Sequence, residues 1–294
     1  MSNSPRAERR PGRSSLRSEV FVAPSIPVVT NDFAPGERTR PWPPIPSTLV
    51  YGAQDALVVD SFITQGQAEA QADWIASSGR RLTTIFSTHG HGDHFFGASV
   101  LLARFPGARF VAHADAVRVM REQVAPEFLS KFWEARFPQQ LPAHLVIAQA
   151  LSANSLELEG ETLQVVPLGF TDTSGSTCLH VPSAGLLAPG DAVYNGVHPR
   201  LVESIQSSKL DEWISALDLL TSLRPKTVVA GHKDPRRPDD PSAISLTRQY
   251  ITDFLTLVQR TGSRRQLYAE MLARYPAWLN RGALWSSAAS AMGG

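Results

Sequence analysis

The sequence predicts a protein of the α/β (α+β) class, in which strands and helices alternate along the chain and stack in layers. Short apolar runs with strand character recur from residue 20 to residue 230, and segments with helical spacing lie between them. A chain of 294 residues suits one large α/β domain or two small ones. Its composition, 43% hydrophobic and 19% charged, is that of a globular protein.

The first half of the chain alternates between predicted strands and predicted helices. Branched and aromatic apolar residues predict the strands, and alanine-rich or amphipathic stretches predict the helices. A proline-rich connection at 41–46 separates the first two strands. We expect strands at 20–29, 49–59, 82–87 and 109–112, and helices at 66–78 and 98–104.

The segment from 115 to 145 has a different character. Apolar residues recur there at helical spacing, around Val117 and Met120 and then around Phe128, Phe132 and Trp133. Two interpretations stay open, namely ordinary core helices or a helical lid that carries aromatic side chains over a cleft. A lid of this kind would favour an apolar substrate.

The second half of the chain also contains several predicted strands. The two ends of the chain differ in composition from the middle. We expect strands at 156–158, 163–166, 179–181, 186–188 and 228–230, a helix at 210–220, and two helices within 242–275. Residues 1–19 are rich in Arg and Ser, which predicts a disordered basic tail. The Gly-, Ala- and Ser-rich segment 286–294 predicts a flexible C-terminus.

Charge and hydropathy exclude several classes of partner. A formal net charge of +1 without a broad basic run argues against nucleic acid. No apolar stretch approaches the roughly 20 residues that a membrane span needs, and no secretory signal peptide is recognisable. The single cysteine, Cys178, allows no internal disulfide. We therefore expect a cytoplasmic protein that acts on a small molecule; a homodimer is compatible with the sequence, but no feature requires one.

The most informative motif is residues 89–94, which read His89-Gly90-His91-Gly92-Asp93-His94. It lies directly between the strand predicted at 82–87 and the helix predicted at 98–104. Imidazole and carboxylate groups together suit zinc, with iron or manganese as alternatives. The intervening glycines allow the backbone to bend so that the ligands converge. The motif therefore predicts a metal site.

An H-x-H-x-D-H motif on a loop after a strand resembles the metallo-β-lactamase fold superfamily. Three further features match that superfamily in the expected order, each after a strand-like run: Asp60, Gly190-Asp191 and Gly231-His232. The resemblance covers about residues 45 to 235. It implies a four-layer αββα sandwich, in which helices flank two mixed β-sheets, and a single domain over residues 20–285.

The resemblance also implies how the metal ligands divide between two sites. One site would hold His89 and His91, together with a histidine from a Gly-His-Thr turn. The other would hold Asp93, His94 and His232, with Asp191 shared between the two sites.

The Gly-His-Thr turn is where this chain departs from the superfamily pattern. Here Phe170 follows Gly169 and precedes Thr171, and a phenyl ring cannot coordinate a metal. We therefore treat Phe170 as an altered ligand position, which leaves the first site short of a ligand. The candidates to replace the histidine are His198, His180 and Asp172.

Three further roles follow from the resemblance. Asp60 would accept the second N–H of a ligand imidazole and so fix its orientation. Tyr194 completes a Gly-Asp-x-x-Tyr spacing that is similar to lactone-cleaving members, whose phenol contacts the substrate carbonyl. Tyr194 would then stabilise the developing oxyanion, although a tyrosine packed at a sheet edge explains it equally well. Asp93 or Asp191 would accept a proton from the attacking water.

These features predict a zinc-dependent hydrolase that uses a zinc-bound hydroxide to cleave a small ester, lactone or amide. The Gly-Asp-x-x-Tyr spacing favours a lactonase-like or esterase activity over a β-lactamase. A glutathione thioesterase is less favoured, because the C-terminal helices offer only Arg264 and Arg265 as a basic pair. Two alternatives depend on the missing ligand, namely a mononuclear iron redox enzyme and a ligand-deficient variant with weakened activity.

Overall fold

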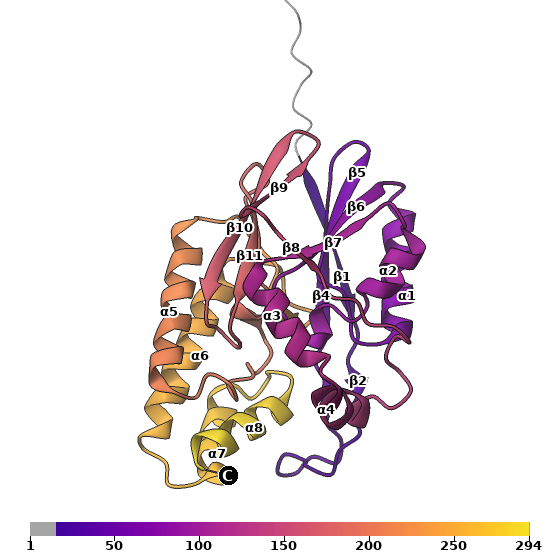
Figure 1. Ribbon diagram of the computed structural model, residues 1–294. Helices are drawn as coiled ribbons and strands as arrows, with labels where there is room; N and C mark the ends of the chain where they lie inside the picture. The colour runs from indigo at the N-terminus through magenta and orange to yellow at the C-terminus, as the bar shows by residue number, and fades with distance from the viewer. Residues whose placement is uncertain (1–15, 294) are drawn as a thin grey trace, which may run out of the picture.

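The computed structural model describes residues 16–293 and contains two β-sheets that face each other between layers of helices. In Figure 1 helices α1 and α2 lie outside one sheet, and helices α5 and α6 lie outside the other. Both sheets are mixed, because each joins antiparallel and parallel neighbours. The expected four-layer αββα sandwich is therefore confirmed.

The first sheet has the strand order β1-β4-β5-β6-β7-β8 and is covered by α1 (Gln65–Ser77) and α2 (Ala98–Arg104). Along its central strand β5, successive side chains point to opposite faces. Ala56 and Val58 pack in the cluster with the helices, whereas Leu57 and Val59 pack in the cluster between the sheets. Its strands are β1 (Arg17–Ala23), β4 (Ile45–Tyr51), β5 (Asp55–Val59), β6 (Arg81–Ser87), β7 (Arg109–Ala112) and β8 (Gln149–Ala150).

The second sheet has the strand order β14-β12-β11-β10-β9 and is covered by α5 (Ser207–Ser222) and α6 (Ser242–Val258). The indole of Trp213 on α5 is fully buried, and its Nε1 donates to the carbonyl of Ala192 at 2.8 Å. The strands are β9 (Ser155–Leu158), β10 (Glu161–Gly169), β11 (Ser176–Val181), β12 (Leu186–Ala188) and β14 (Thr227–Val228).

Short elements connect the layers and frame the open end of the sandwich. The segment expected at 115–145 forms α3 (Ala114–Gln123), the short α4 (Pro126–Phe128) and a π-helical turn, η2 (Leu129–Glu134). Two further sheets have two strands each. One pairs β2 (Ile26–Pro27) with β3 (Pro41–Trp42), and the other pairs β13 (Tyr194–Asn195) with β15 (His232–Lys233). The C-terminal helices are α7 (Arg264–Arg274) and α8 (Arg281–Ala291).

Several predicted boundaries were wrong. Residues 17–19, expected in the disordered tail, belong to β1, where they pair with β4; residues 1–15 lie outside the described part of the chain. The run 49–59 is a hairpin of β4 and β5 rather than one strand.

The C-terminal segment expected to be flexible is helical as far as Ala291. The side chains of Ser287 and Ala288 on α8 are buried. Ser287 Oγ also accepts a hydrogen bond from the backbone N–H of Leu201 at 2.9 Å. The small side chains of α8 let it pack closely against its neighbours. The same Gly-, Ala- and Ser-rich composition had led us to expect a flexible segment.

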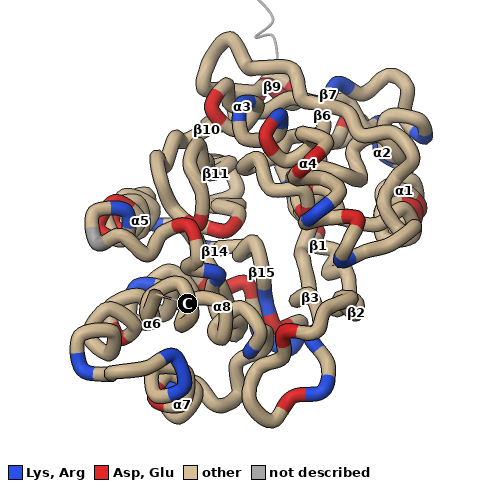
Figure 2. Tube along the Cα trace, turned by 60° about the horizontal axis from the view of Figure 1, so that its bottom comes forward, with Lys and Arg blue, Asp and Glu red and all other residues tan. Residues whose placement is uncertain are grey.

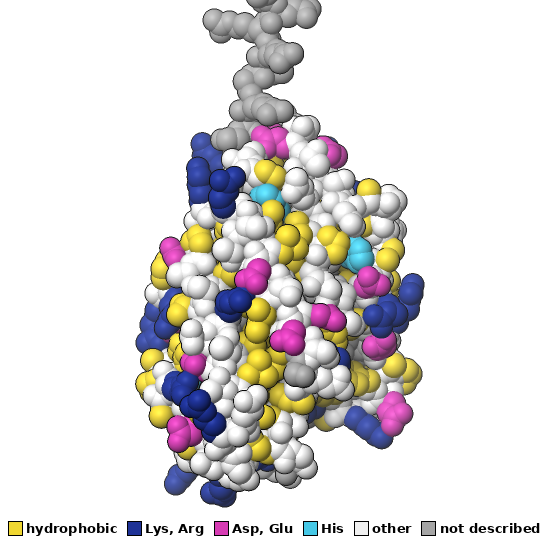
Figure 3. Space-filling model, turned by 90° about the vertical axis from the view of Figure 1, so that its left-hand side faces the viewer, with side chains coloured by type: hydrophobic (Ala, Val, Ile, Leu, Met, Phe, Trp, Pro, Cys, Tyr) yellow, Lys and Arg dark blue, Asp and Glu magenta, His cyan; other side chains and the backbone are white. Residues whose placement is uncertain are grey.

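Charges are spread over the described surface. In Figure 2 Lys, Arg, Asp and Glu are scattered along the trace, and Figure 3 shows charged side chains interspersed with hydrophobic ones over the α5 and α6 face. Among residues 16–293, no helix is both long enough and apolar enough to cross a membrane.

Candidate metal centre

Seven buried side chains meet where the ends of strands from both sheets converge. Their potential ligand atoms form overlapping groups within 4.8 Å of one another. The groups are His89–His94–Asp191, His89–His91–Asp172, and Asp93–His94–His232. The structure thus brings together all six side chains that we expected as ligands, and adds Asp172.

The loop after β6 delivers four of these side chains through a 3-10 turn, η1 (Gly92–His94). Its glycines serve close packing rather than an unusual backbone conformation. A Cβ on Gly90 would lie 2.5 Å from Val119 Cβ on α3, and one on Gly92 would lie 2.5 Å from the Phe96 ring. Neither glycine has a positive φ. We expected them to allow a bend, but the structure shows that they admit neighbouring elements.

The structure places Asp172, one of the three candidate substitutes, beside His89 and His91, and it places Phe170 away from them. Asp172 Oδ2 lies 2.9 Å from His91 Nδ1 and 3.8 Å from His89 Nε2. The Phe170 ring instead faces Lys209, whose Nζ lies 4.3 Å from the ring centroid. The sequence reads Phe170-Thr171-Asp172-Thr173, which contains two Xaa-Thr pairs. The first residue of the second pair, Asp172, is the one that lies at the cluster.

The other two substitutes lie away from the cluster. His198 is fully buried between Tyr250 and Trp278, and its Nδ1 lies 3.0 Å from the Tyr250 hydroxyl. His180 on β11 is half-buried and pairs with Gln164 on the neighbouring strand. Asp172 is therefore the one of the three that the fold brings to His89 and His91.

Asp60 holds the metal loop from the end of β5. Its Oδ1 accepts from the Thr88 N–H at 2.8 Å, and its Oδ2 accepts from Thr88 Oγ1 at 2.9 Å and lies 3.0 Å from His94 Nδ1. This places the His94 proton on Nδ1 and leaves Nε2 free to face the cluster. Asp60 has a positive φ of 60°, a conformation that costs energy and concentrates at functional sites.

Outer acceptors also orient His91 and His232. His91 Nε2 lies 3.2 Å from Glu203 Oε1, which also accepts from Arg200 at 2.7 Å. His232 Nδ1 lies 3.1 Å from the carbonyl of Pro44. Each of these contacts leaves the opposite ring nitrogen facing the cluster, as outer partners of metal-bound histidines do.

Two aromatic side chains donate to the cluster carboxylates. The Tyr194 hydroxyl donates to Asp191 Oδ2 at 2.6 Å, and the Trp42 indole donates to Asp93 Oδ2 at 2.9 Å. Tyr194 also stacks on His232, with ring centroids 5.7 Å apart. Its hydroxyl therefore positions the Asp191 carboxylate. Of the two roles that we expected, the structure shows a packed tyrosine, and the oxyanion donor stays a prediction.

The buried charges of the cluster shift the pKa values of its own side chains. Burial opposes protonation of His91, but Glu203 and Asp172 outweigh it and raise the pKa of His91 to about 10. In the same way Asp191 and Asp93 raise the pKa of His232 to about 9 against its burial. Burial also works against ionisation of Asp191, yet His232 and His94 hold the pKa of that carboxyl well below its usual range.

The unpartnered atoms fit a bound cation. His89 Nε2, His94 Nε2 and Asp191 Oδ1 are buried and make no hydrogen bond among the described residues. His94 Nε2 and Asp191 Oδ1 lie 3.1 Å apart without hydrogen-bond geometry. Buried polar atoms are nearly always satisfied, so three at one point indicate a missing partner. Nitrogen and oxygen donors in this combination suit a divalent transition metal.

Comparison with known proteins agrees with this geometry. The family model described as "Metallo-beta-lactamase superfamily" matches residues 40–232. The chain belongs to this superfamily. It is similar to a metallo-beta-lactamase family protein from Thermus thermophilus, with 20% identity, a TM-score of 0.60, and coverage of 90% of this chain and 91% of that one. A metallo-beta-lactamase from Pontibacter korlensis gives 16% identity and a TM-score of 0.55 over 81% and 99% of the two chains.

A curated relative matches a short part of this chain. Hydroxyacylglutathione hydrolase from Francisella tularensis subsp. novicida is 34% identical over 67 residues, which are 23% of this chain and 25% of the relative. The match therefore spans about a quarter of that relative's length.

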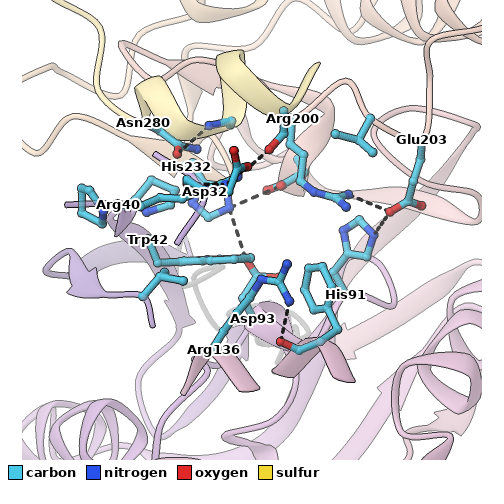
Figure 4. A pocket seen from close by; sticks show the side chains of 18 of the residues that line it. Asp32, Arg40, Trp42, His91, Asp93, Arg136, Arg200, Glu203, His232 and Asn280 are labelled. Atoms are coloured by element: carbon cyan, nitrogen blue, oxygen red, sulfur yellow. Dashed lines mark hydrogen bonds and ion pairs between the residues drawn. The ribbon is translucent and has the colours of Figure 1, made fainter. Parts of the chain in front are cut away.

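A cavity of about 500 Å³ opens onto the metal centre of this superfamily member (Figure 4). Asp93, Asp191 and His232 line its floor, and Trp42, Phe132 and Trp133 line its walls. The volume is typical of a small-molecule site. Within the segment 115–145, Trp133 and Phe137 are buried whereas Phe128 is 38% exposed, and Phe128, Phe132 and Trp133 border the cavity. The lid over the cleft stays a prediction.

The sequence alone did not indicate several residues of this centre. Trp42 lies in the proline-rich connection, and Glu203 and Arg200 lie in the loop before α5, where no periodicity or motif marks them. Thr88, next to the H-x-H-x-D-H motif, could have been found by its position. The sequence did contain a signal for Asp172, because Asp172-Thr173 repeats the Xaa-Thr pattern of Phe170-Thr171.

Proposed function

We propose that the protein is a metal-dependent hydrolase of a small ester, lactone or amide. One observation carries this proposal, namely the buried His/Asp cluster with unpartnered ligand atoms at the floor of an aromatic-walled cavity. Membership of the metallo-beta-lactamase superfamily supports it, and so does the short match to a relative named as a hydrolase.

The two sets of ligands would each hold one divalent ion. His89, His91 and Asp172 would hold the first, and Asp93, His94 and His232 the second, with Asp191 between them. Such an ion supplies Lewis acidity, which lowers the pKa of a bound water to about 7 and polarises a carbonyl. We expect zinc, although a carboxylate in place of an imidazole makes the first set richer in oxygen and so more tolerant of manganese or iron.

The chain's own residues would orient the reaction. Asp93 faces the cavity; burial opposes ionisation of its carboxyl, but His94 and His232 hold its pKa low, so it is ionised and would bind a cation. The proton of the attacking water would pass to Asp93 or Asp191. Trp42 fixes one of its oxygens, and Tyr194 fixes Asp191. Cys178 is not a candidate nucleophile, because burial raises the pKa of its thiol and its side chain lies in the core.

The position of Asp172 favours the hydrolase over the two alternative functions. Both the mononuclear iron enzyme and the ligand-deficient variant were inferred from a first site without its third ligand. Asp172 lies beside His89 and His91, where it would supply that ligand, and this supports the hydrolase over both alternatives.

The test is hydrolysis by the purified protein, first loaded with zinc and then stripped with a chelator. The substrates are 4-nitrophenyl butyrate, γ-nonalactone, a chromogenic cephalosporin and S-lactoylglutathione. We expect metal-dependent turnover of the ester or the lactone, loss of this turnover in Asp191→Asn, and retention in the control His180→Gln. A protein with full metal content that hydrolyses none of the four would refute the proposal.

A further inference from the structure

Four guanidinium groups line the cavity above the metal centre. They belong to Arg40, Arg136, Arg200 and Arg264, and Figure 4 labels the first three. Away from the metal centre the only carboxylates among the described lining residues are Asp32 and Glu203. The upper part of the cavity therefore carries more positive than negative charge.

Three of these guanidinium groups already have carboxylate partners. Arg40 pairs with Asp32 at 2.8 Å and also donates to Gly282 and Ser286 on α8. Arg264 lies 3.4 Å from the same Asp32 and stacks on Trp285. Arg200 pairs with Glu203 at 2.7 Å. These three arginines hold the walls of the cavity together.

Arg136 is different, because it makes no ion pair within the described residues. Its Nη1 donates to the carbonyl of Phe132 at 2.8 Å, and its guanidinium lies 3.8 Å from the centroid of the Phe132 ring. Burial lowers the pKa of Arg136, and the charges of Arg40 and Arg200 lower it further; the Asp32 carboxylate, which makes no ion pair with Arg136, opposes this in part. In Figure 4 its side chain points into the cavity.

The carboxylates at the floor of the cavity do not neutralise Arg136. Asp93 accepts from Trp42 and faces His232, and Asp191 accepts from Tyr194 and also faces His232. A half-buried guanidinium without a counter-ion is costly, and it becomes favourable once an anion forms charge-assisted hydrogen bonds with it.

The surroundings of Arg136 suit an anion with an apolar body. Phe128, directly before the π-helical turn, and Phe132 within it stack with ring centroids 5.1 Å apart, and Trp133 lies against Phe132. Such π-helical turns occur frequently at functional sites. Trp42 completes the apolar wall on the opposite element, at 5.4 Å from Trp133.

We propose that the substrate is an organic anion, in which a carboxylate binds Arg136 and an apolar chain or ring packs on Phe128, Phe132 and Trp42. This inference rests on the proposed hydrolase function for the scissile bond, but the anion subsite does not depend on turnover. It changes the expectation of an apolar substrate into that of an amphiphilic one.

Binding measurements can separate this subsite from the metal centre. We would titrate 3-phenylpropionate and its neutral counterpart 3-phenylpropionamide into metal-free protein by calorimetry. The carboxylate should bind about tenfold more tightly than the amide, and Arg136→Gln should remove this preference while leaving amide affinity unchanged. Arg136→Lys should retain part of it, and Arg121→Gln, an exposed control on α3, should retain all of it.

Two results would overturn the inference. One is equal affinity for the two probes in metal-free protein. The other is a preference for the carboxylate that appears only with zinc and survives Arg136→Gln, because the anion would then bind the metal. The midpoint of thermal unfolding of each variant would show whether it is folded.

Kinetics then link the subsite to the reaction. Mono-4-nitrophenyl glutarate should have a KM about tenfold lower than 4-nitrophenyl butyrate, and Arg136→Gln should raise that KM with little effect on kcat. Hydrolysis of both esters with equal KM would overturn the substrate class but not the hydrolase. Absence of hydrolysis with intact carboxylate binding would overturn the hydrolase but not the anion subsite.

Discussion

Replacing Asp60 with asparagine should weaken metal binding without unfolding the protein. The Asp60 carboxylate makes three contacts: it accepts from the Thr88 N–H and the Thr88 hydroxyl, and it lies 3.0 Å from His94 Nδ1. Asparagine has almost the same shape and tolerates the positive φ at this position at least as well. However, its NH₂ group must face either the Thr88 N–H or His94 Nδ1, and both of these are donors.

The size of the effect follows from the tautomer of His94. If the asparagine NH₂ donates to Nδ1, the His94 proton moves to Nε2, which is the atom that faces Asp191 and the metal centre. Loss of such an outer partner costs about 10- to 100-fold in metal affinity, or about 1.4 to 2.7 kcal/mol.

The assay is zinc titration against a competing chelator, with circular dichroism to check the fold. Asp73→Asn, an exposed change on α1, serves as the control. Wild-type zinc affinity in a folded Asp60→Asn protein would refute this reasoning about His94.

Three further predictions test other parts of the site. Phe170→His should leave metal content unchanged, because Phe170 faces Lys209 rather than the cluster; plasma mass spectrometry checks this, and a gain of metal would restore Phe170 as a ligand position. Tyr194→Phe should lower zinc affinity as well as kcat, since the phenol holds Asp191; a lower kcat at unchanged affinity would instead favour an oxyanion donor. His198 is held neutral by burial, which lowers its pKa to about 3. Below pH 6.5 the unfolded chain gains a proton at this residue that the folded protein does not, so stability falls as pH falls, by about 2 kcal/mol at pH 5. The free energy of unfolding of His198→Gln should depend less steeply on pH from 6.5 to 4 than that of the wild type, and an equal slope would contradict this account.

The fold and most of the cluster could be predicted from the sequence because they depend on local patterns. Short apolar runs predicted β6 and, as the second half of the run at 49–59, β5, and Asp60 and the H-x-H-x-D-H motif follow these strands directly. Ser286 to Ala291 was misread because small residues look flexible until a neighbour such as Leu201 is known to pack against them.

The remaining features depend on contacts that no local pattern records. Glu203 contacts His91, although the two residues are 112 positions apart in the sequence. Asp172 was a candidate, but the choice between the two Xaa-Thr pairs needed the geometry of the turn between β10 and β11. The register of β10 against β11 shifts between Pro167 and Gly169, directly before this turn, and such an irregularity cannot be deduced from residue spacing.

The most direct test of the account is the metal content of the wild type and of Asp172→Ala after zinc loading, measured by plasma mass spectrometry. We expect about two zinc ions per chain in the wild type and about one in Asp172→Ala, because each ligand set would hold one ion. Asp172→His should retain two, and so should the exposed control Asp115→Ala. Two ions in Asp172→Ala, or one in the wild type, would contradict the claim that Asp172 completes the first site.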